Sequence, residues 1–170
     1  MKRLFFALWP DHETRERIAA VSKMLPEKCG RRVPAANLHI TLVFLGNIDE
    51  QQCRDVQQAA SEISSRSFTL KLDRAGKWSR SKVIWLAHTT IPEELTSLVA
   101  ELNESAINCR IQIENRPYRP HVTLARKVRG PVPPLDIEPF EWAIKSFALV
   151  QSETLPQGAQ YAVIQNWPLG

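Results

Sequence analysis

Apolar residues recur along this chain with two periods, and each period predicts one kind of secondary structure. Apolar positions three and four residues apart predict helices at residues 11–25, 49–65 and 92–108. Asp11 and Asp49 suit the N-caps of the first two helices, and Thr90-Ile-Pro-Glu93 has the form of a capping box for the third. Short runs rich in β-branched and aromatic side chains predict strands at 4–9, 38–45, 68–72, 83–87, 122–125, 141–150 and 161–165.

The order of these elements predicts an α+β fold, with helices packed outside largely antiparallel sheets. We expect the strands at 68–72 and 83–87 to form a hairpin through residues 76–81. The strand–helix–strand unit of residues 4–45 has a counterpart at 83–125, after which a proline segment replaces the expected helix. The sequence therefore predicts a single domain over residues 1–170, built from two lobes in a pseudo-twofold arrangement.

The composition bounds the class of protein. A chain of 170 residues with 44% hydrophobic side chains can bury one core. Its longest apolar run, residues 4–9, is far too short for a membrane helix and lacks the cleavage site of a signal peptide, so we expect no membrane association and no secretion. Cys29, Cys53 and Cys109 show no metal-ligand spacing and are predicted to be small apolar side chains in a reducing compartment, the cytoplasm.

The net charge is +4, and its distribution is uneven. Residues 66–82 and 110–129 each hold six lysines or arginines against one acid, whereas 93–104 holds four glutamates and no base. If the basic segments lie together, they form a positive face that attracts phosphates. On charge alone, an ordinary solvated surface is the simpler interpretation.

Each of the four histidines precedes a threonine by two positions, so this bare pattern carries little information. His12 falls on the first turn of a predicted helix, and the threonine that follows His88 suits the cap of another. We therefore expect structural roles for both.

His39 and His121 differ, because they begin two copies of the pattern His-apolar-Thr-Leu inside predicted strands. Side chains alternate along a strand, so each histidine shares a face with its threonine, Thr41 or Thr123. A pseudo-twofold axis would bring the two imidazoles and the two hydroxyls together. The intervening apolar residues point the other way and are expected in the core: Ile40, Leu42, Phe44, Val122 and Leu124.

This constellation suits phosphodiester chemistry. In-line displacement at phosphorus needs a base for the attacking oxygen and an acid for the leaving oxygen, and histidine serves either role near neutral pH. Threonine hydroxyls can donate hydrogen bonds to the non-bridging oxygens. Two histidines without a nearby carboxylate or thiolate fall short of a zinc site, and the chain has no glycine-rich phosphate loop.

Two longer stretches resemble the motifs of the 2H phosphoesterase superfamily. They are Asn-Leu-His-Ile-Thr-Leu-Val-Phe-Leu-Gly at 37–46 and Arg-Pro-Tyr-Arg-Pro-His-Val-Thr-Leu-Ala-Arg at 116–126. Together with residues 3–7 they are similar to the bacterial RNA 2′,3′-cyclic phosphodiesterases, historically called 2′-5′ RNA ligases. Ser152, Gly158 and Tyr161 fit the closing strands of that family more loosely.

The resemblance implies a bilobal fold whose two motifs face each other across a central cleft. It also implies hydrolysis of a terminal 2′,3′-cyclic phosphate to a 2′-phosphate, with neither metal nor cofactor. By analogy His39 is the general acid for the leaving 3′ oxygen, His121 is the general base for water, and Thr41 and Thr123 hold the phosphate. Arg126 is expected near that phosphate, although strict alternation from His121 points it away unless the strand ends or bulges there.

Other functions stay open on the sequence alone. The resemblance also implies ATP-independent 2′-5′ ligation by reversal, in which the nearly symmetric histidines can exchange roles. A non-catalytic RNA-binding module of the same fold, or a cyclic phosphodiesterase acting on a small nucleotide, would also account for the motifs. The expected partner is RNA with 2′,3′-cyclic phosphate ends, tRNA fragments being one candidate source, and we expect a monomer. The five tryptophans include candidates for base stacking but are expected mainly in the core.

Overall fold

The computed structural model describes residues 1–170 and contains two antiparallel sheets. The larger has eight strands in the order β10-β9-β1-β3-β7-β6-β5, with β2 beside β7, and the smaller pairs β4 with β8. The strands of the larger sheet are β1 (Lys2–Leu8), β2 (Arg31–Arg32), β3 (Ile40–Ile48), β5 (Arg74–Trp78), β6 (Val83–Ala87), β7 (Val122–Arg126), β9 (Ser146–Leu155) and β10 (Gly158–Pro168). The smaller sheet consists of β4 (Phe68–Leu72) and β8 (Phe140–Ile144).

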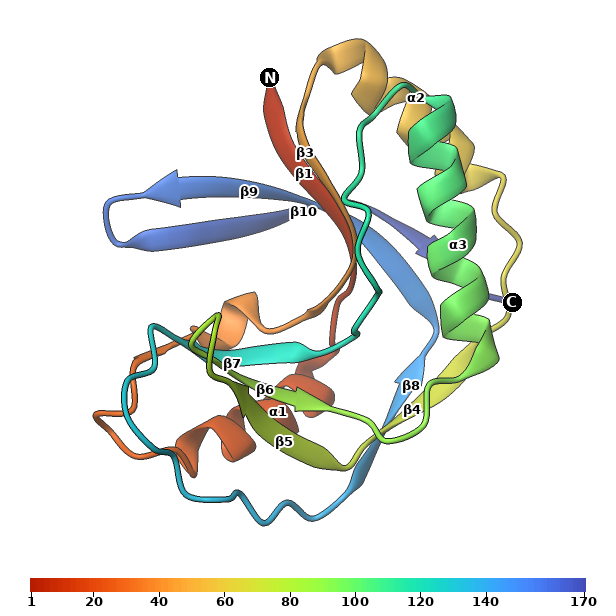
Figure 1. The fold of residues 1–170 in the computed structure, drawn as a ribbon. Helices are drawn as coiled ribbons and strands as arrows, with labels where there is room; N and C mark the ends of the chain where they lie inside the picture. The colour runs from red at the N-terminus through yellow and green to blue at the C-terminus, as the bar shows by residue number, and fades with distance from the viewer.

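The larger sheet is divided into two halves that meet at one residue pair. The upper half comprises β10, β9, β1 and β3, and the lower half comprises β7, β6 and β5 with β2. Between β3 and β7 the only paired residues are Ile40 and Val122. Figure 1 shows the two halves as the arms of a C that opens to the left. The paired residues directly follow His39 and His121, so the junction itself places the two histidines.

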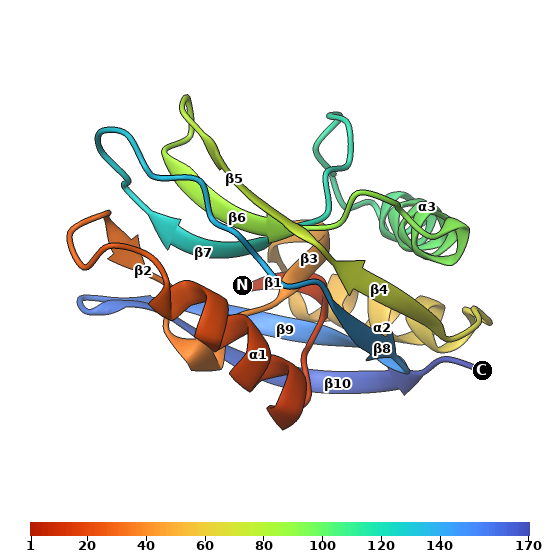
Figure 2. The same cartoon turned by 90° about the horizontal axis from the view of Figure 1, so that it is seen from below.

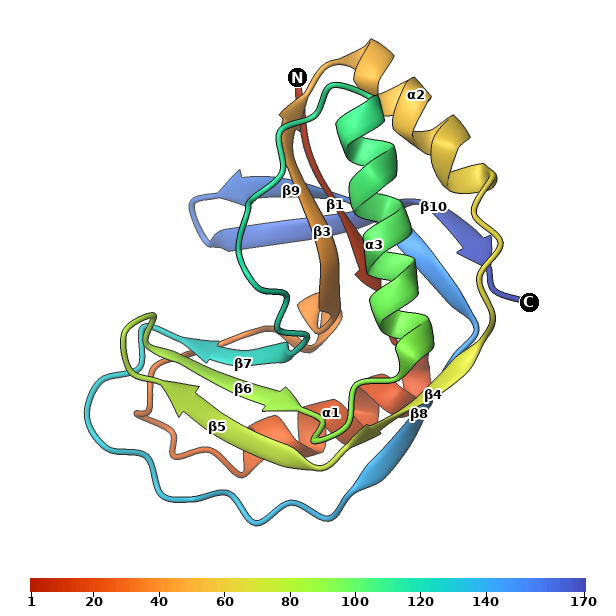
Figure 3. The ribbon, with the colours of Figure 1, turned by 45° about the vertical axis from the view of Figure 1, so that its right-hand side comes forward.

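Three helices lie outside the C, which confirms the predicted α+β class. They are α1 (His12–Lys23), α2 (Glu50–Ser61) and α3 (Glu93–Asn108), and a short 3-10 helix covers Ala35–Asn37. The helices α2 and α3 lie side by side, away from the open side of the C (Figure 3). Seen from below, α1 and α3 lie on opposite sides of the molecule (Figure 2).

All three predicted helices are present, and two of the three predicted N-terminal caps are confirmed. The Asp11 carboxylate accepts a hydrogen bond from the Thr14 N–H at 2.8 Å. Asp49 and Gln52 form a reciprocal capping box. The capping box predicted at Thr90 is wrong, because α3 starts at Glu93 behind Pro92, which makes no side-chain cap bond. Glu93 is thus the first helical residue, and a box from Thr90 would need it to be the third.

Two predicted strand arrangements are also wrong. The strand at 68–72 does not pair with 83–87, because β4 pairs with β8 and the hairpin partner of β6 is β5. The sequence of β5, Arg-Ala-Gly-Lys-Trp, has too few apolar residues to predict a strand. The predicted strand at 141–150 is two strands in different sheets, since β8 ends at Ile144 and β9 begins at Ser146.

Phe44 departs from the predicted core. Ile40, Leu42, Val122 and Leu124 are buried, as expected. The pairing of β3 with β1 shifts register twice, between Leu4/Phe5 and between Phe6/Ala7 on β1, and each shift inserts an extra residue into β3. Such bulges change which face the following side chains occupy. Phe44 therefore packs against the small cluster of Phe5 and Ala7, apart from the main core.

The three cysteines are wholly or partly buried, as predicted for small apolar side chains. All three cysteines are free thiols, with Cys29 and Cys53 buried and Cys109 partly buried. None of the three helices combines the length and the hydrophobicity needed to cross a bilayer.

Candidate active site

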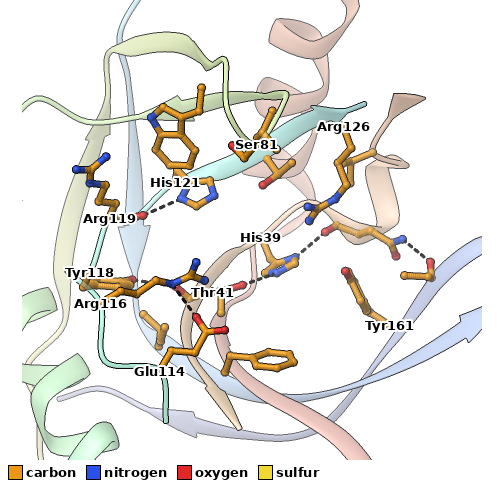
Figure 4. Close-up of a pocket in the computed structure, with 18 of the residues that line it drawn as sticks. His39, Thr41, Ser81, Glu114, Arg116, Tyr118, Arg119, His121, Arg126 and Tyr161 are labelled. Carbon is orange, nitrogen blue, oxygen red and sulfur yellow. Dashed lines mark hydrogen bonds and ion pairs between the residues drawn. The ribbon is translucent and has the colours of Figure 1, made fainter. Parts of the chain in front are cut away.

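A cleft of about 1240 Å³ lies between the two halves of the sheet. Its lining includes all five residues that the sequence singled out: His39, Thr41, His121, Thr123 and Arg126. Figure 4 shows the two imidazoles in this cleft, with His39 on the side of Tyr161 and His121 on the side of Arg119. The expected proximity of the two motifs is therefore present in the fold.

Backbone carbonyls fix the ring orientation and the tautomer of both histidines. Nδ1 of His39 lies 2.7 Å from the carbonyl oxygen of Asn37, and Nδ1 of His121 lies 2.7 Å from that of Arg119. A carbonyl can only accept, so each Nδ1 carries the proton and donates it. In the neutral ring each Nε2 then keeps a lone pair. The two anchors repeat the same spacing, a carbonyl two residues before the histidine.

The two threonines differ in their contacts. The hydroxyl of Thr41 lies 2.9 Å from Nε2 of His39 and donates to that nitrogen while the ring is neutral. No equivalent bond joins Thr123 to His121, although Thr123 lines the same cleft. Tyr118, which sequence reasoning did not single out, donates its hydroxyl proton to the carbonyl of Thr41 at 3.0 Å. This bond ties the segment before His121 to the strand that follows His39.

Aromatic rings surround the His39 imidazole. The Trp9 ring stacks on it with centroids 5.5 Å apart, Phe5 lies at 4.9 Å, and Tyr161 presents an edge at 5.3 Å. On the other side of the cleft, Trp78 meets His121 edge-on at 4.6 Å. The other three tryptophans are buried, as the sequence predicted for most of them: Trp85, Trp142 and Trp167.

This packing shifts the pKa of both histidines downwards. Burial lowers the pKa of His39 from 6.5 to about 4, and the positive charge of Arg126 adds to the effect while the Asn37 carbonyl opposes it. Burial also lowers the pKa of His121, with Arg126 and Arg116 contributing and the Arg119 carbonyl opposing. Both imidazoles are therefore neutral near pH 7. An anion placed between them would raise both pKa values by favouring the charged rings.

Arg126 reaches the cleft because β7 bulges. In the pairing with β6, Ile84 lies opposite Ala125 and Trp85 lies opposite Thr123, so Leu124 is the extra residue. Leu124 and Ala125 are both fully buried, and Arg126 then points to the cleft side. The sequence analysis placed Arg126 near the phosphate only if the strand ends or bulges before it, and that bulge is present at Leu124.

The cleft is strongly cationic. Glu114, which is paired with Arg116 at 2.7 Å, is the single carboxylate of the lining. Every cation comes from a strand of the lower half, from the turn between β5 and β6, or from the segments directly before and after β7, and none comes from the upper half. The basic residues of the lining are Arg31, Arg32, Lys77, Arg80, Arg116, Arg119, Arg126 and Lys127.

Part of this charge was predictable from the sequence. Six of the eight cations belong to the two basic segments at 66–82 and 110–129. Arg31 and Arg32 were missed, because a two-residue strand leaves no periodic signal. Some basic residues of the predicted segments lie outside the lining, Arg66 and Lys71 among them. His12 and His88 also lie outside it, and the structure contains no group of three or more histidine, cysteine, aspartate or glutamate side chains arranged to hold a metal.

Comparisons with known proteins agree with this geometry. The sequence matches the LigT like phosphoesterase family twice, at residues 8–85 and 86–161, and each match contains one of the two His-apolar-Thr-Leu motifs. The chain is 36% identical to the RNA 2′,3′-cyclic phosphodiesterase of Escherichia coli, over 99% of this chain and 97% of that protein. It is 32% identical to the protein of the same name from Thermus thermophilus, over 98% and 90%.

Solved structures give the same result. The crystal structure of E. coli LigT in apo form superposes with a TM-score of 0.88 at 35% identity, covering 99% of this chain and 97% of that one. The structure of E. coli LigT complexed with 3′-AMP gives a TM-score of 0.86 at 35% identity, covering 99% and 98%. The fold, the paired matches and the full-length similarity show that this chain belongs to the LigT like phosphoesterase family.

Proposed function

We propose that the protein hydrolyses the 2′,3′-cyclic phosphate at RNA 3′ ends to a 2′-phosphate, with His39 as general acid and His121 as general base. The observation that carries this proposal is the matched pair of imidazoles, each anchored through Nδ1 to a carbonyl, in one cationic cleft. The names of the homologous proteins support the substrate and the reaction.

The reaction divides between the two rings as follows. Nε2 of His121 takes a proton from water as the water oxygen attacks phosphorus. The bond between phosphorus and the 3′ oxygen breaks on the opposite side, and His39 donates a proton from Nε2 to that oxygen. Exchange with solvent then restores the original protonation of both rings. The opened phosphate stays on the 2′ oxygen.

His39 must carry a second proton to act as the acid, and its low pKa opposes this. The bound phosphate supplies the missing stabilisation, because its negative charge offsets the desolvation of the imidazolium and the repulsion by Arg126. Thr41, Thr123 and Arg126 are proposed to hold the non-bridging oxygens, where charge builds up in the transition state. With both proton transfers and the charge stabilisation assigned to side chains, we propose that no metal takes part.

The test uses purified protein, EDTA and a short RNA that ends in a 2′,3′-cyclic phosphate, with the product identified by phosphorus NMR. We expect a 2′-phosphate, and we expect His39→Ala and His121→Ala each to abolish turnover. A 3′-phosphate would reverse the assignment of the leaving oxygen, and with it the placement of acid and base. Tight RNA binding without turnover would favour the non-catalytic module instead.

Ligation is the second proposed activity. By microscopic reversibility, a 5′-hydroxyl that replaces water would open the cyclic phosphate and form a 2′-5′ linkage without ATP. Mixing a cyclic-phosphate RNA with a 5′-hydroxyl RNA and resolving the products on a denaturing gel tests this activity. We expect hydrolysis to dominate, since water is the more abundant nucleophile.

We also propose that the whole chain acts as one domain and as a monomer, because every residue assigned above comes from a single chain. The three free thiols support a cytoplasmic location. Sedimentation of the purified protein tests the monomer, with a stable dimer as the contrary result. The natural RNA, with tRNA fragments as one candidate, is testable by sequencing RNA that accumulates with cyclic phosphates when the protein is absent.

A further inference from the structure

Two arginines face each other across neighbouring strands at the edge of the cleft. Arg31 on β2 lies directly opposite Arg126 on β7 in an antiparallel pair. Side chains at such positions project from the same face of a sheet, with Cα atoms about 4.5–5.5 Å apart. Like charges placed directly opposite each other destabilise a sheet.

No carboxylate relieves this repulsion. The three ion pairs of the molecule involve Arg17, Arg54 and Arg116, so neither Arg31 nor Arg126 has an acidic partner. The acid of the cleft lining, Glu114, is engaged by Arg116 at 2.7 Å. Two unneutralised guanidinium groups on one face form a binding arrangement for anions, and for phosphate in particular.

The two arginines reach different parts of the cleft. Arg126 lowers the pKa of both histidines, whereas Arg31 contributes to neither shift. The guanidinium of Arg31 instead donates to the carbonyl of Gln157, in the turn between β9 and β10. Arg126 points towards the imidazoles (Figure 4), and Arg31 points towards the hairpin tip.

The contact of Arg31 with the hairpin can be exchanged for a ligand. A backbone carbonyl is a neutral acceptor, and a phosphate oxygen forms a stronger, charge-assisted bond with a guanidinium. The approach depends on Gly158, because a Cβ built there would lie 2.8 Å from the Arg31 guanidinium and its φ of +126° disfavours other residues. The hairpin tip thus leaves room for the Arg31 side chain.

We propose that Arg31 binds the phosphate that precedes the terminal cyclic phosphate of an RNA chain, so that the enzyme prefers an oligonucleotide end over a mononucleotide. The inference rests on the proposed function, since it takes the cyclic phosphate to lie between the histidines beside Arg126. The next phosphate of the chain then meets the next cation outwards. Arg31 determines specificity without touching the reacting atoms.

The test compares two substrates, a uridine dinucleotide ending in a 2′,3′-cyclic phosphate and uridine 2′,3′-cyclic phosphate itself. For the wild type we expect a higher kcat/KM with the dinucleotide. Arg31→Gln keeps an amide donor for the Gln157 carbonyl and removes the charge. We expect it to lose about tenfold in kcat/KM with the dinucleotide, the scale of one charge-assisted hydrogen bond, and to leave the mononucleotide unchanged.

Two controls separate charge at this site from charge in general. Arg66→Gln removes an exposed charge outside the cleft and should change neither substrate's kcat/KM. Arg31→Lys retains the positive charge and should retain most of the dinucleotide preference. The logarithmic salt dependence of the dinucleotide KM should fall by about 0.7 in Arg31→Gln, the value for one phosphate contact on a single strand.

Other outcomes would overturn the inference. An equal loss with both substrates would place Arg31 at the reacting phosphate. If the ratio of kcat/KM for the dinucleotide to that for the mononucleotide is the same in Arg31→Gln as in the wild type, Arg31 only supports the hairpin. The proposed hydrolysis would still stand. If the wild type turns over neither substrate, the proposed function fails first and the inference fails with it.

Discussion

Acidification should destabilise this protein through His39 in a way that can be calculated. In the folded protein the ring is enclosed by Phe5, Trp9 and Tyr161, and its pKa is about 4. In the unfolded chain a histidine titrates near its ordinary value of about 6.5. As the pH falls, the unfolded state therefore binds the proton first.

The sign and size of the effect follow from this difference in pKa. The contribution of His39 to stability is fully present above pH 6.5 and is lost progressively as the pH falls towards 4, where both states are protonated. Integration over this window gives a loss of about 2.5 kcal/mol at pH 4.5 relative to pH 7. That is a substantial fraction of the 5–15 kcal/mol by which typical domains are stable.

Urea denaturation at several pH values between 4.5 and 7.5 measures the effect. Acidic groups also titrate in this range, so the useful quantity is the difference between the wild type and His39→Asn. The asparagine amide can still donate to the Asn37 carbonyl, and it does not titrate. The free energy of unfolding of the wild type should fall by about 2.5 kcal/mol more than that of the variant between pH 7 and pH 4.5.

A difference that stays constant with pH would refute the reasoning, because it would mean that His39 titrates alike in both states. Proton NMR of the folded protein provides an independent check, with the His39 ring expected to remain neutral well below pH 6. Inorganic phosphate should shift the transition upwards, since an anion in the cleft favours the charged ring.

Three further substitutions test other parts of the structure. Asp49→Ala removes a helix cap and should cost about 1 kcal/mol in urea denaturation without changing turnover, and unchanged stability would contradict the assigned cap. Trp9→Ala removes the ring stacked on His39, so the pKa of His39 in an NMR titration should rise towards 6.5, and a further fall would contradict the assigned cause. Gly76→Ala places a Cβ 2.4 Å from the Trp85 ring and should cost about 1–3 kcal/mol by thermal unfolding, whereas no loss would show that the ring moves freely.

The sequence predicted the features that depend on local periodicity. The helices begin where Asp11 and Asp49 offer side-chain caps, and the core faces of the two motif strands follow from alternation. The family could also be predicted from the sequence, because two long motifs carry the resemblance. The comparisons confirm it. The location of both histidines in one cleft agrees with the expected repeat, and their catalytic roles remain predictions.

Features that depend on distant parts of the chain escaped prediction. The partner of β4 is β8, about 70 residues later, and no local pattern encodes that pairing. Bulges explain why strict alternation predicted the wrong side of the sheet for Phe44 and left the side of Arg126 undecided. One extra residue in a strand moves every following side chain to the opposite face. Arg31 lies in a two-residue strand, too short for any period.

The one-sided placement of the cations has a consequence for how a substrate lies in the cleft. Two matched imidazoles at a pseudo-dyad would by themselves accept a cyclic phosphate in either of two orientations related by that axis. All eight basic residues of the lining come from the half of the sheet that contains His121 or from the segments flanking its strands, and the rings that enclose His39 come from the other half and from the segment after β1. The binding energy of an RNA end, with its phosphates and its ribose, therefore differs between the two orientations. The uneven charge therefore selects one orientation of the bound cyclic phosphate, whereas the two histidines alone would accept both.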